Sequence, residues 1–316
     1  MEKVDGGGYG ENRTDDAVCS PGDSTRKGEA ARLPGVPEEP GARLQGLEEM
    51  SAKIDADTAE PVLLRSDDEG IVTLTLNRPE KFNALSEALL ARIQHELDEI
   101  ASDDTLRVVV IAANGKAFSA GHDLKEMRAS DDREHHRALF DRCGRMMVSI
   151  NRLPQPVIAQ VNGIATAAGC QLVANCDLAV AADDARFAVS GINFGLFCST
   201  PAVPLSRNVP RKHAMEMLLT GDFISAEQAR DFGLVNEVVP AAELESATRA
   251  LAAKITAKSA HSIRLGKDMF YRQLSMDLAE AYAYASERMA CNMDSQDARE
   301  GIDAFIEKRR PEWKHR

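Results

Sequence analysis

The stretch Val161–Ala182, VNGIATAAGCQLVANCDLAVAA, holds the pattern that decides the fold. It begins at the end of QPVIAQV (Gln155–Val161), an apolar run that predicts a buried strand. Small residues then lead into an expected helix from about Ala167, and DLAVAA predicts a second strand. A strand, a helix and a strand in succession indicate α/β architecture with crossover connections.

The same alternation continues toward the N-terminus. IVTLTL (Ile71–Leu76) alternates with period two and predicts a strand, and RVVVIAA (Arg107–Ala113) predicts a strand buried on both faces. From Pro210 onward the pattern is mostly helical. Between the first two strands, apolar residues at steps of four and three predict one face of an amphipathic helix: Leu85, Leu89, Ile93, Leu97 and Ile100.

Composition limits the class of protein. The 316 residues carry a net charge of −12, which argues against nucleic acid or an anionic membrane as the main partner. No apolar run approaches the roughly 18 residues that a membrane span needs. Residues 1–60 are acidic and rich in glycine and proline, so we expect them to be disordered. Their excess of acids is unlike a mitochondrial transit peptide.

The six cysteines form no C-x-x-C pair, and no histidine stands at ligand spacing from any of them. We therefore expect no metal site. Cys170, Cys176 and Cys198 lie among apolar or small residues, which is typical of buried, reduced thiols in a reducing compartment.

Two glycine-containing segments follow buried strands and enter helices: GKAFSAGHDLKEM (115–127) and GIATAAGCQL (163–172). Each places unpaired backbone N–H groups at a helix start, where the helix dipole favours negative charge. Two such groups directed at one point form an oxyanion hole. Spacing alone thus predicts an α/β enzyme with such a hole.

Five segments between about Val62 and Trp313 form a combined pattern: LNRPEKFNAL, GKAFSAGHDLKEM, VNGIATAAGCQLVANCDLAVAADDARFA, LLTGDFISAEQARDFGLVNEVV and REGIDAFIEKRRPEW. In these segments the chain resembles the crotonase superfamily, which includes enoyl-CoA hydratases and isomerases. The resemblance implies a core of repeated ββα units over residues 61–260 and a helical region over 261–316 that serves oligomerisation and covers CoA. It also implies an acyl-CoA substrate, no cofactor apart from the substrate's own CoA, and a homotrimer or hexamer.

The resemblance assigns roles by position. The oxyanion donors would be the backbone N–H groups of His122 and Ala168. Phe305 and Lys308 would close over the nucleotide, in some relatives from a neighbouring subunit. Lysines on the expected CoA path are also explained as solvated surface residues, and Asp123 as a loop or helix cap. The expected CoA-binding residues are Lys81, Phe82, Ala120, Asp123, Leu124 and Lys125.

The chain departs from the hydratase pattern at both acid positions. Gln171 and Gly191 stand where hydratases of this family carry glutamates. Neither residue can exchange a proton with water or the α-carbon, so we expect little hydratase activity from this lyase or isomerase of acyl-CoA metabolism. Two alternatives remain: decarboxylation of a malonyl-type ester with help from the His122 ring, and acyl-CoA binding without catalysis. The expected location is the cytoplasm, or the mitochondrial matrix in a eukaryote.

Overall fold

The computed structural model describes residues 60–316. The predicted disordered segment, residues 1–60, therefore lies outside the described residues except for Glu60. The strands are β1 (Leu63–Asp68), β2 (Ile71–Leu76), β3 (Val108–Ala113), β4 (Ala117–Ser119), β5 (Val157–Val161), β6 (Ile164–Thr166), β7 (Leu178–Ala182), β8 (Arg186–Ala188), β9 (Ile224–Ser225) and β10 (Glu237–Val239).

The larger sheet has the strand order β1-β2-β3-β5-β7-β10. Only β1 and β2 pair antiparallel in it, and the other neighbours are parallel. Ile71 of β2 pairs with Val108 of β3, and neither strand carries a charged residue. Five of the six residues of β3 are buried, as expected for a strand covered on both faces. The predicted α/β class is confirmed.

A smaller sheet of order β4-β6-β8-β9 stands beside the larger one. Its strands have only two or three residues, too few for periodicity to reveal them in the sequence. Ala117 of β4 pairs with Ile164 of β6, and both strands run parallel. Because parallel neighbours end at the same edge, the chain leaves β4 and β6 side by side and enters the two predicted oxyanion loops there.

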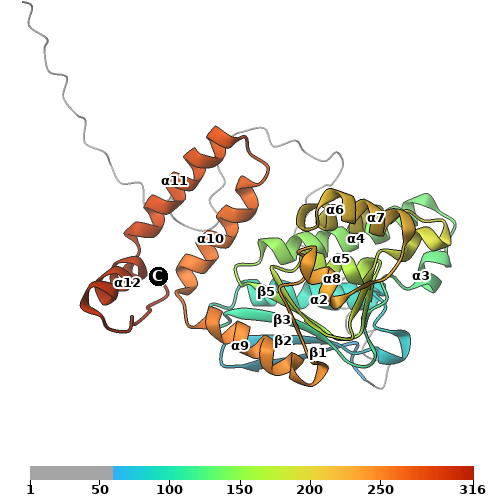
Figure 1. Ribbon diagram of the computed structural model, residues 1–316, viewed down its shortest axis with the longest axis horizontal. Coiled ribbons are helices and arrows are strands. Elements are labelled where there is room, and N and C mark those ends of the chain that lie inside the picture. The colour runs from blue at the N-terminus through green and yellow to red at the C-terminus, as the bar shows by residue number, and fades with distance from the viewer. Residues whose placement is uncertain (1–59) are drawn as a thin grey trace, which may run out of the picture.

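The helices cover the sheets and form the C-terminal part of the molecule (Figure 1). They are η1 (Pro79–Lys81), α2 (Glu87–Ala101), α3 (Leu124–Arg128), α4 (Arg133–Arg152), α5 (Ala168–Asn175), η2 (Ser190–Phe194), α6 (Ser199–Asn208), α7 (Arg211–Thr220), α8 (Ala226–Asp231), η3 (Ala241–Glu243), α9 (Leu244–Thr256), α10 (Ala260–Gln273), α11 (Leu278–Asp294) and α12 (Gln296–Glu307).

Helix α2 begins where its sequence predicts a cap. The Ser86 side chain accepts a hydrogen bond from the Leu89 N–H at 3.2 Å, which satisfies one of the unpaired donors of the first turn. The five residues of the predicted apolar face are buried. Leu85 lies before the helix and forms an isolated parallel bridge with His122, so this part of the core also supports a predicted site residue.

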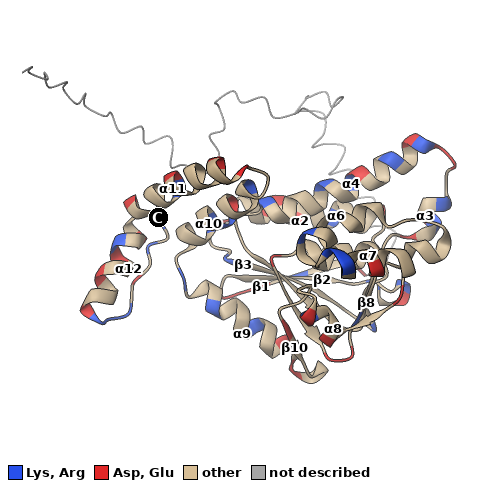
Figure 2. Ribbon diagram, turned by 45° about the horizontal axis from the view of Figure 1, so that its top comes forward, with Lys and Arg blue, Asp and Glu red and all other residues tan. Residues whose placement is uncertain are grey.

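Helix α10 joins the C-terminal helices to the core through a buried polar cluster. Lys267 Nζ lies 2.6 Å from Asp177 Oδ2, and the Tyr271 hydroxyl donates to Asp177 Oδ1 at 2.8 Å. Helices α11 and α12 pack against α10 and each other and extend away from the sheets (Figure 1). Charged residues are concentrated on the outer helices (Figure 2). The division at residue 260 coincides with the start of α10 and stays a prediction.

Candidate functional site

The two predicted oxyanion loops touch each other directly. A methyl group on Gly169, in the first turn of α5, would lie 2.2 Å from the Ser119 carbonyl oxygen. A methyl group on Gly121, at φ +89°, would lie 3.0 Å from the Ala168 nitrogen. The first contact is closer than real side chains show and the second is tighter than most, and the positive φ of Gly121 also disfavours a side chain, so glycine at these two positions lets the backbones approach. The loop after β4 therefore lies against the start of α5.

Two backbone N–H groups remain unpaired at this contact. The Leu85 N–H donates to the Gly121 carbonyl at 2.8 Å, but the amide of the next residue, His122, has no acceptor within residues 60–316. The Ala168 N–H, the first of α5, likewise has none there. The start of α5 leaves the Ala168 donor free, and His122 stands just before Asp123, the N-cap of α3. Two free donors on touching loops can stabilise negative charge on a carbonyl oxygen.

The turn into α5 is strained. Ala167 has φ +50° and ψ −120°, a conformation that suits glycine and that other residues rarely adopt. Its N–H donates to the Ala188 carbonyl at 3.1 Å, and its carbonyl accepts from the Gln171 N–H at 3.0 Å. These two bonds hold the residue in place. The conformation directs the chain from β6 into the helix immediately before Ala168.

Asn83 holds the first loop, a role that the sequence did not reveal. It is fully buried, and its Nδ2 donates to the carbonyls of Asn114 and Ala117, both at 2.8 Å. Its own carbonyl accepts from the Ser119 hydroxyl at 2.9 Å. Asn83 has φ +51°, a conformation that asparagine tolerates better than most residues. The sequence signal available for this role was an asparagine placed between the Pro79–Lys81 turn and the start of α2.

The His122 ring lies in an apolar setting. Neither ring nitrogen has a hydrogen-bond partner in the described part of the chain, and both are buried. The ring meets Phe140 of α4 edge to face, with centroids 5.5 Å apart. Burial lowers the pKa of His122, and the nearby Leu85 carbonyl opposes this shift only in part. The imidazole is therefore neutral near pH 7.

Gln171 and Gly191, the two predicted acid positions, have different surroundings. Gln171 is 3% exposed, and its Oε1 has no partner among the described residues. A methyl group on Gly191 would lie 2.6 Å from the Leu196 carbonyl oxygen and 2.7 Å from Cys198 Sγ. The Gly191 N–H donates to that sulfur at 3.2 Å. The space that a side chain at residue 191 would need is thus already filled.

The other predicted contacts lie around the first loop. Ala120 is exposed, and its N–H donates to the Phe82 carbonyl at 3.0 Å, which joins the two predicted CoA-path segments. Phe82 and Leu124 are more than half exposed, and Lys81 and Lys125 are exposed. Because these side chains project from the surface, they are free to meet a ligand. Their binding role stays a prediction.

Asp123 caps a helix, which is one of the two roles that the sequence predicted for it, the other being CoA binding. Its side chain accepts from the Lys125 N–H at 3.0 Å and caps α3. A second, longer contact of 4.0 Å joins it to Arg78 Nη2. The carboxylate thus fixes the orientation of the loop next to His122. The capping prediction is confirmed, and a contact with CoA stays a prediction.

The thiols near the site are buried and free, as expected from the sequence. Burial raises the pKa of Cys170 to about 12 and also raises the pKa of Cys198. A thiolate is therefore disfavoured at both residues, which argues against Cys198 as a nucleophile.

Comparisons with known proteins agree with this geometry. The profile of the enoyl-CoA hydratase/isomerase family matches residues 66–316. The chain belongs to the enoyl-CoA hydratase/isomerase family. It is 49% identical over 247 residues to the mouse protein named enoyl-CoA hydratase domain-containing protein 3, mitochondrial. The matched region covers 78% of this chain and 82% of the mouse protein.

Further relatives extend the comparison. The 2,3-dehydroadipyl-CoA hydratase of Escherichia coli is 35% identical over 256 residues, which cover 80% of this chain and 99% of that protein. The crystal structure of an enoyl-CoA hydratase from Mycobacterium smegmatis superposes with a TM-score of 0.79 at 60% identity, and covers 80% of this chain and 99% of that chain. The predicted crotonase fold is thus confirmed. Among residues 60–316 no helix has the length and apolar character needed to cross a membrane.

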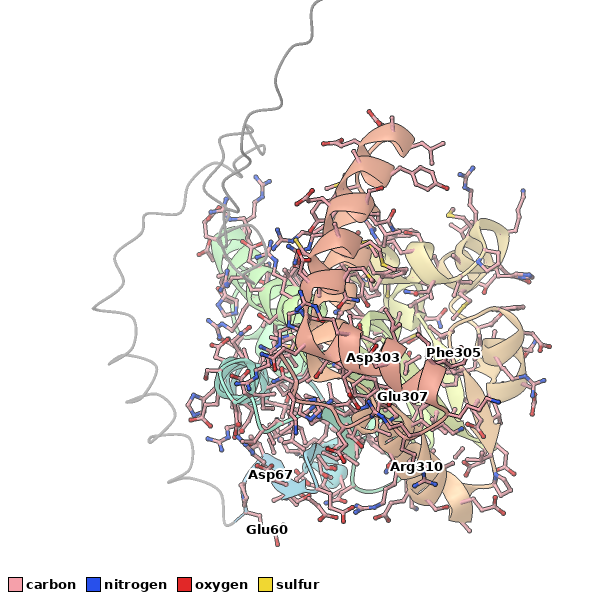
Figure 3. All side chains as sticks on the ribbon, turned by 90° about the vertical axis from the view of Figure 1, so that its left-hand side faces the viewer. Glu60, Asp67, Asp303, Phe305, Glu307 and Arg310 are labelled. Carbon is pink, nitrogen blue, oxygen red and sulfur yellow. The ribbon has the colours of Figure 1, made fainter. Side chains whose placement is uncertain are left out.

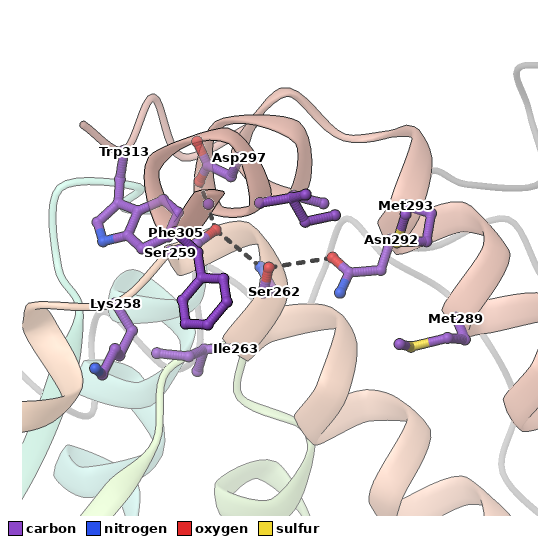
Figure 4. A pocket seen from close by; sticks show the side chains of 13 residues that line it. Lys258, Ser259, Ser262, Ile263, Met289, Asn292, Met293, Asp297, Phe305 and Trp313 are labelled. Atoms are coloured by element: carbon purple, nitrogen blue, oxygen red, sulfur yellow. Dashed lines mark hydrogen bonds between the residues drawn. The ribbon is translucent and has the colours of Figure 1, made fainter. Parts of the chain in front are cut away.

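The C-terminal segment of this family member lies far from the predicted oxyanion loops. Figures 1 and 2 place α12 and α3 at opposite ends of the molecule. Phe305 of α12 is 85% exposed and lies on the outer surface with Asp303 and Glu307 (Figure 3). It borders an open pocket of about 700 Å³ between α10 and the last two helices, together with Trp313 (Figure 4). Within one chain, Phe305 is therefore not brought to the predicted CoA path.

Proposed function

We propose that this chain binds acyl-CoA thioesters and polarises the thioester carbonyl between the backbone N–H groups of His122 and Ala168. The observation that carries the proposal is the contact between the two loops, in which neither amide has an acceptor among residues 60–316. Donors that are already in place stabilise an oxyanion without reorganisation when charge develops. The names of relatives, which refer to CoA thioesters, support the same substrate class.

We further propose that hydration of an enoyl-CoA is slow. A carboxamide at Gln171 can orient water but cannot accept its proton, and Gly191 has no side chain. General acid–base catalysis contributes typically about 10²–10⁴-fold, so a site without either acid lacks most of this acceleration. Leu196 and Cys198 fill the space next to Gly191, and neither of them carries a carboxylate.

The test combines binding and turnover. Isothermal titration of the full chain with butyryl-CoA, which has no double bond to hydrate, should show binding. Crotonyl-CoA should be hydrated far more slowly than the common enzyme range of about 1–10³ s⁻¹. Hydration within that range would contradict the weak-hydratase proposal, and failure to bind butyryl-CoA would contradict the proposed function itself.

One observation favours a second candidate, the decarboxylation of a malonyl-type CoA ester. The His122 ring is buried beside the predicted oxyanion donor, and neither of its nitrogens has a partner in residues 60–316. In this reaction the ester's carboxylate leaves as CO₂, and its bonding electrons form a thioester enolate that is then protonated. The oxyanion donors stabilise that enolate, and no strong base is needed.

Methylmalonyl-CoA distinguishes this candidate. Release of CO₂ by the wild type that is lost in His122→Phe would support decarboxylation, because the variant keeps the backbone N–H and removes the ring nitrogens. If the wild type releases no CO₂, the candidate is excluded.

We also propose a homotrimer or hexamer assembled through the C-terminal helices. Leu278, Phe305 and Ile306 are 75%, 85% and 70% exposed, which is a large apolar surface for helices that extend from the core. A neighbouring subunit would then bring Phe305 and Lys308 to the CoA of another copy. Light scattering of the wild type should give a trimer or larger, and Phe305→Glu should weaken it. A monomeric wild type would contradict this proposal.

The proposed compartment is the cytoplasm or the mitochondrial matrix. Buried free thiols such as Cys170 and Cys176 suit a reducing environment. The relatives named as mitochondrial are compatible with the second location. Fluorescence microscopy of the tagged full chain in its native host checks this point, and secretion of the tagged chain would contradict it.

A further inference from the structure

Residues 311–316, which follow α12, return to the junction between α9 and α10. The Trp313 Nε1–H donates to the Ala257 carbonyl at 2.8 Å, and a methyl group on Gly301 of α12 would lie 3.1 Å from the Trp313 ring. Trp313 also borders the open pocket between α10 and the last two helices (Figure 4). We call residues 311–316 the C-terminal strap, because they join α12 to the start of α10.

A buried carboxylate holds the strap. Asp297, in the first turn of α12, is 1% exposed. It accepts from the Lys314 N–H at 2.7 Å and from the His315 N–H at 3.0 Å, and Ser259, the N-cap of α10, donates to it as well. His315 has φ +62°, a conformation that is uncommon outside glycine. The contacts of the strap therefore hold it in place at a cost in backbone strain.

The His315 ring stands between two groups that can only donate. Arg107 Nη1 lies 3.1 Å from its Nε2, and the Ala260 N–H is directed at its Nδ1 at 3.2 Å. Arg107 is fixed there, because its Nη2 donates to the Lys258 carbonyl at 2.7 Å. A neutral imidazole has one acceptor nitrogen, so each tautomer satisfies one of the two donors. An imidazolium has no acceptor and satisfies neither.

Charges around the ring act against a proton on it. Partial burial and the Arg107 guanidinium lower the pKa of His315, and the Asp297 carboxylate opposes them only in part. The charge of Arg264 on α10 is paired with Asp104 at 2.7 Å. The charged or titratable side chains around the ring are those of Arg107, Arg264, His261, Asp297, Lys314 and Arg316.

We propose that the C-terminal strap is an acid-sensitive device, which holds α12 to the α9–α10 junction while His315 is neutral and is released when His315 takes up a proton. The protonated ring would present N–H groups to Arg107 and Ala260, so both contacts would be lost and two positive charges would face each other. Release would loosen the attachment of α12 to α10. The inference goes beyond acyl-CoA binding and does not depend on it.

The direction of the pH dependence follows from the lowered pKa. The strap should be fully held above the ordinary histidine pKa of about 6.5 and released as the pH falls below that value. Trp313 is the single tryptophan of the chain, so its fluorescence reports on the strap directly. Between about pH 8 and pH 5, the emission of the full-length wild type should shift reversibly to longer wavelength, without loss of the far-ultraviolet circular dichroism.

Three variants assign this shift to His315. His315→Gln keeps one acceptor and does not titrate in this range, so it should keep the emission of the wild type at pH 8 and lose the transition. His315→Lys places a permanent cation beside Arg107 and should show the shifted emission already at pH 8. His261→Gln is the matched control, because it removes a neighbouring histidine of α10 and should retain the transition.

The outcomes decide the proposal. A wild type whose emission does not change with pH would overturn it, and so would a transition that persists in His315→Gln. Loss of the transition in His261→Gln would assign the device to the other histidine and would also overturn it. If acid unfolds the whole chain, as circular dichroism would show, His315→Lys at pH 8 decides the question, because it adds the charge without acid. Unshifted emission of that variant would contradict release by charge.

Discussion

The loops that carry His122 and Ala168 and the wall formed by residues 190–198 belong to the same predicted site, but they contribute different groups. The loops present backbone N–H groups, and close packing of Gly169 on Ser119 fixes their separation. The wall would have to present a side chain, and there Gly191 has its space filled by neighbouring atoms. Polarisation by backbone dipoles depends on the shape of the chain, whereas proton transfer depends on residue identity. A family member can therefore retain the first and lose the second.

Gly169→Ala should have the largest effect, because it separates the two loops. The new methyl would lie 2.2 Å from a backbone oxygen, and neither helix α5 nor strand β4 can move away easily. We expect a loss of about 3 kcal/mol in the free energy of unfolding, and a loss of butyryl-CoA binding. Urea denaturation and titration calorimetry measure the two effects.

The matched control is Gly144→Ala. Gly144 lies in α4 with nothing within 4 Å of the added methyl, so alanine should stabilise the chain by about 0.5–1 kcal/mol. If Gly169→Ala were as harmless as this control, the close contact between the loops would not exist.

Gly191→Ala should have the next largest effect and should act on the wall alone. The methyl would meet the Leu196 carbonyl oxygen at 2.6 Å and Cys198 Sγ at 2.7 Å. We expect a destabilisation of about 1–3 kcal/mol, since the 195–198 segment is a surface turn that can shift at some cost. Thermal denaturation of this variant measures the effect.

The double variant Gln171→Glu with Gly191→Glu places a carboxylic acid at both predicted acid positions. Because the space at residue 191 is filled, we expect no large gain in crotonyl-CoA hydration over the wild type. An increase of about 10² or more, the size of one acid–base contribution, would show that the wall opens readily.

The sequence predicted most of the larger sheet and few of the short elements. IVTLTL and VVVIAA have six residues each, enough for period-two alternation and a continuous apolar run to be recognised. The strands β4, β6, β8 and β9 have two or three residues, and their pairing partners are distant in sequence. No local pattern determines such pairing, so the smaller sheet required the tertiary structure.

The site was partly predictable for the same reason. Glycines and a helix start marked the loops, because backbone approach demands particular residue types. The packing of Leu196 and Cys198 over Gly191 involves a turn whose direction the sequence does not specify. The Asn83 side chain donates hydrogen bonds to the carbonyls of Asn114 and Ala117. These carbonyls come within reach only after β3 and β4 have folded. The residue types were visible, and their partners were not.

Ala167→Gly should change the stability less than the substitutions of Gly169 and Gly191, and it should stabilise the chain. Ala167 adopts φ +50° and ψ −120°, and strain of this kind costs about 1–3 kcal/mol. Glycine removes the strain but increases the entropy of the unfolded chain by about 0.4–1 kcal/mol. The net result should be a stabilisation of about 1 kcal/mol, visible as a higher melting temperature. A lower melting temperature would mean that the Ala167 methyl contributes more packing energy than its backbone strain costs.

The smallest expected effect is a change in the pH dependence of stability in His122→Phe. Burial lowers the pKa of His122 in the folded chain, so the unfolded chain binds this proton more readily. Its contribution is complete above the ordinary histidine pKa of about 6.5 and decreases as the pH falls below that value. Phenylalanine keeps an aromatic ring beside Phe140 and cannot be protonated. Urea denaturation between about pH 8 and pH 5.5 should therefore give a shallower loss of stability in the variant than in the wild type.

His261 and His315, whose pKa values are also lowered by burial, remain in both proteins, so the difference between the two slopes isolates His122. Identical slopes would mean that the His122 ring is solvated in the folded chain, and the loop next to Ala168 would then be more open than the close packing at Gly169 implies.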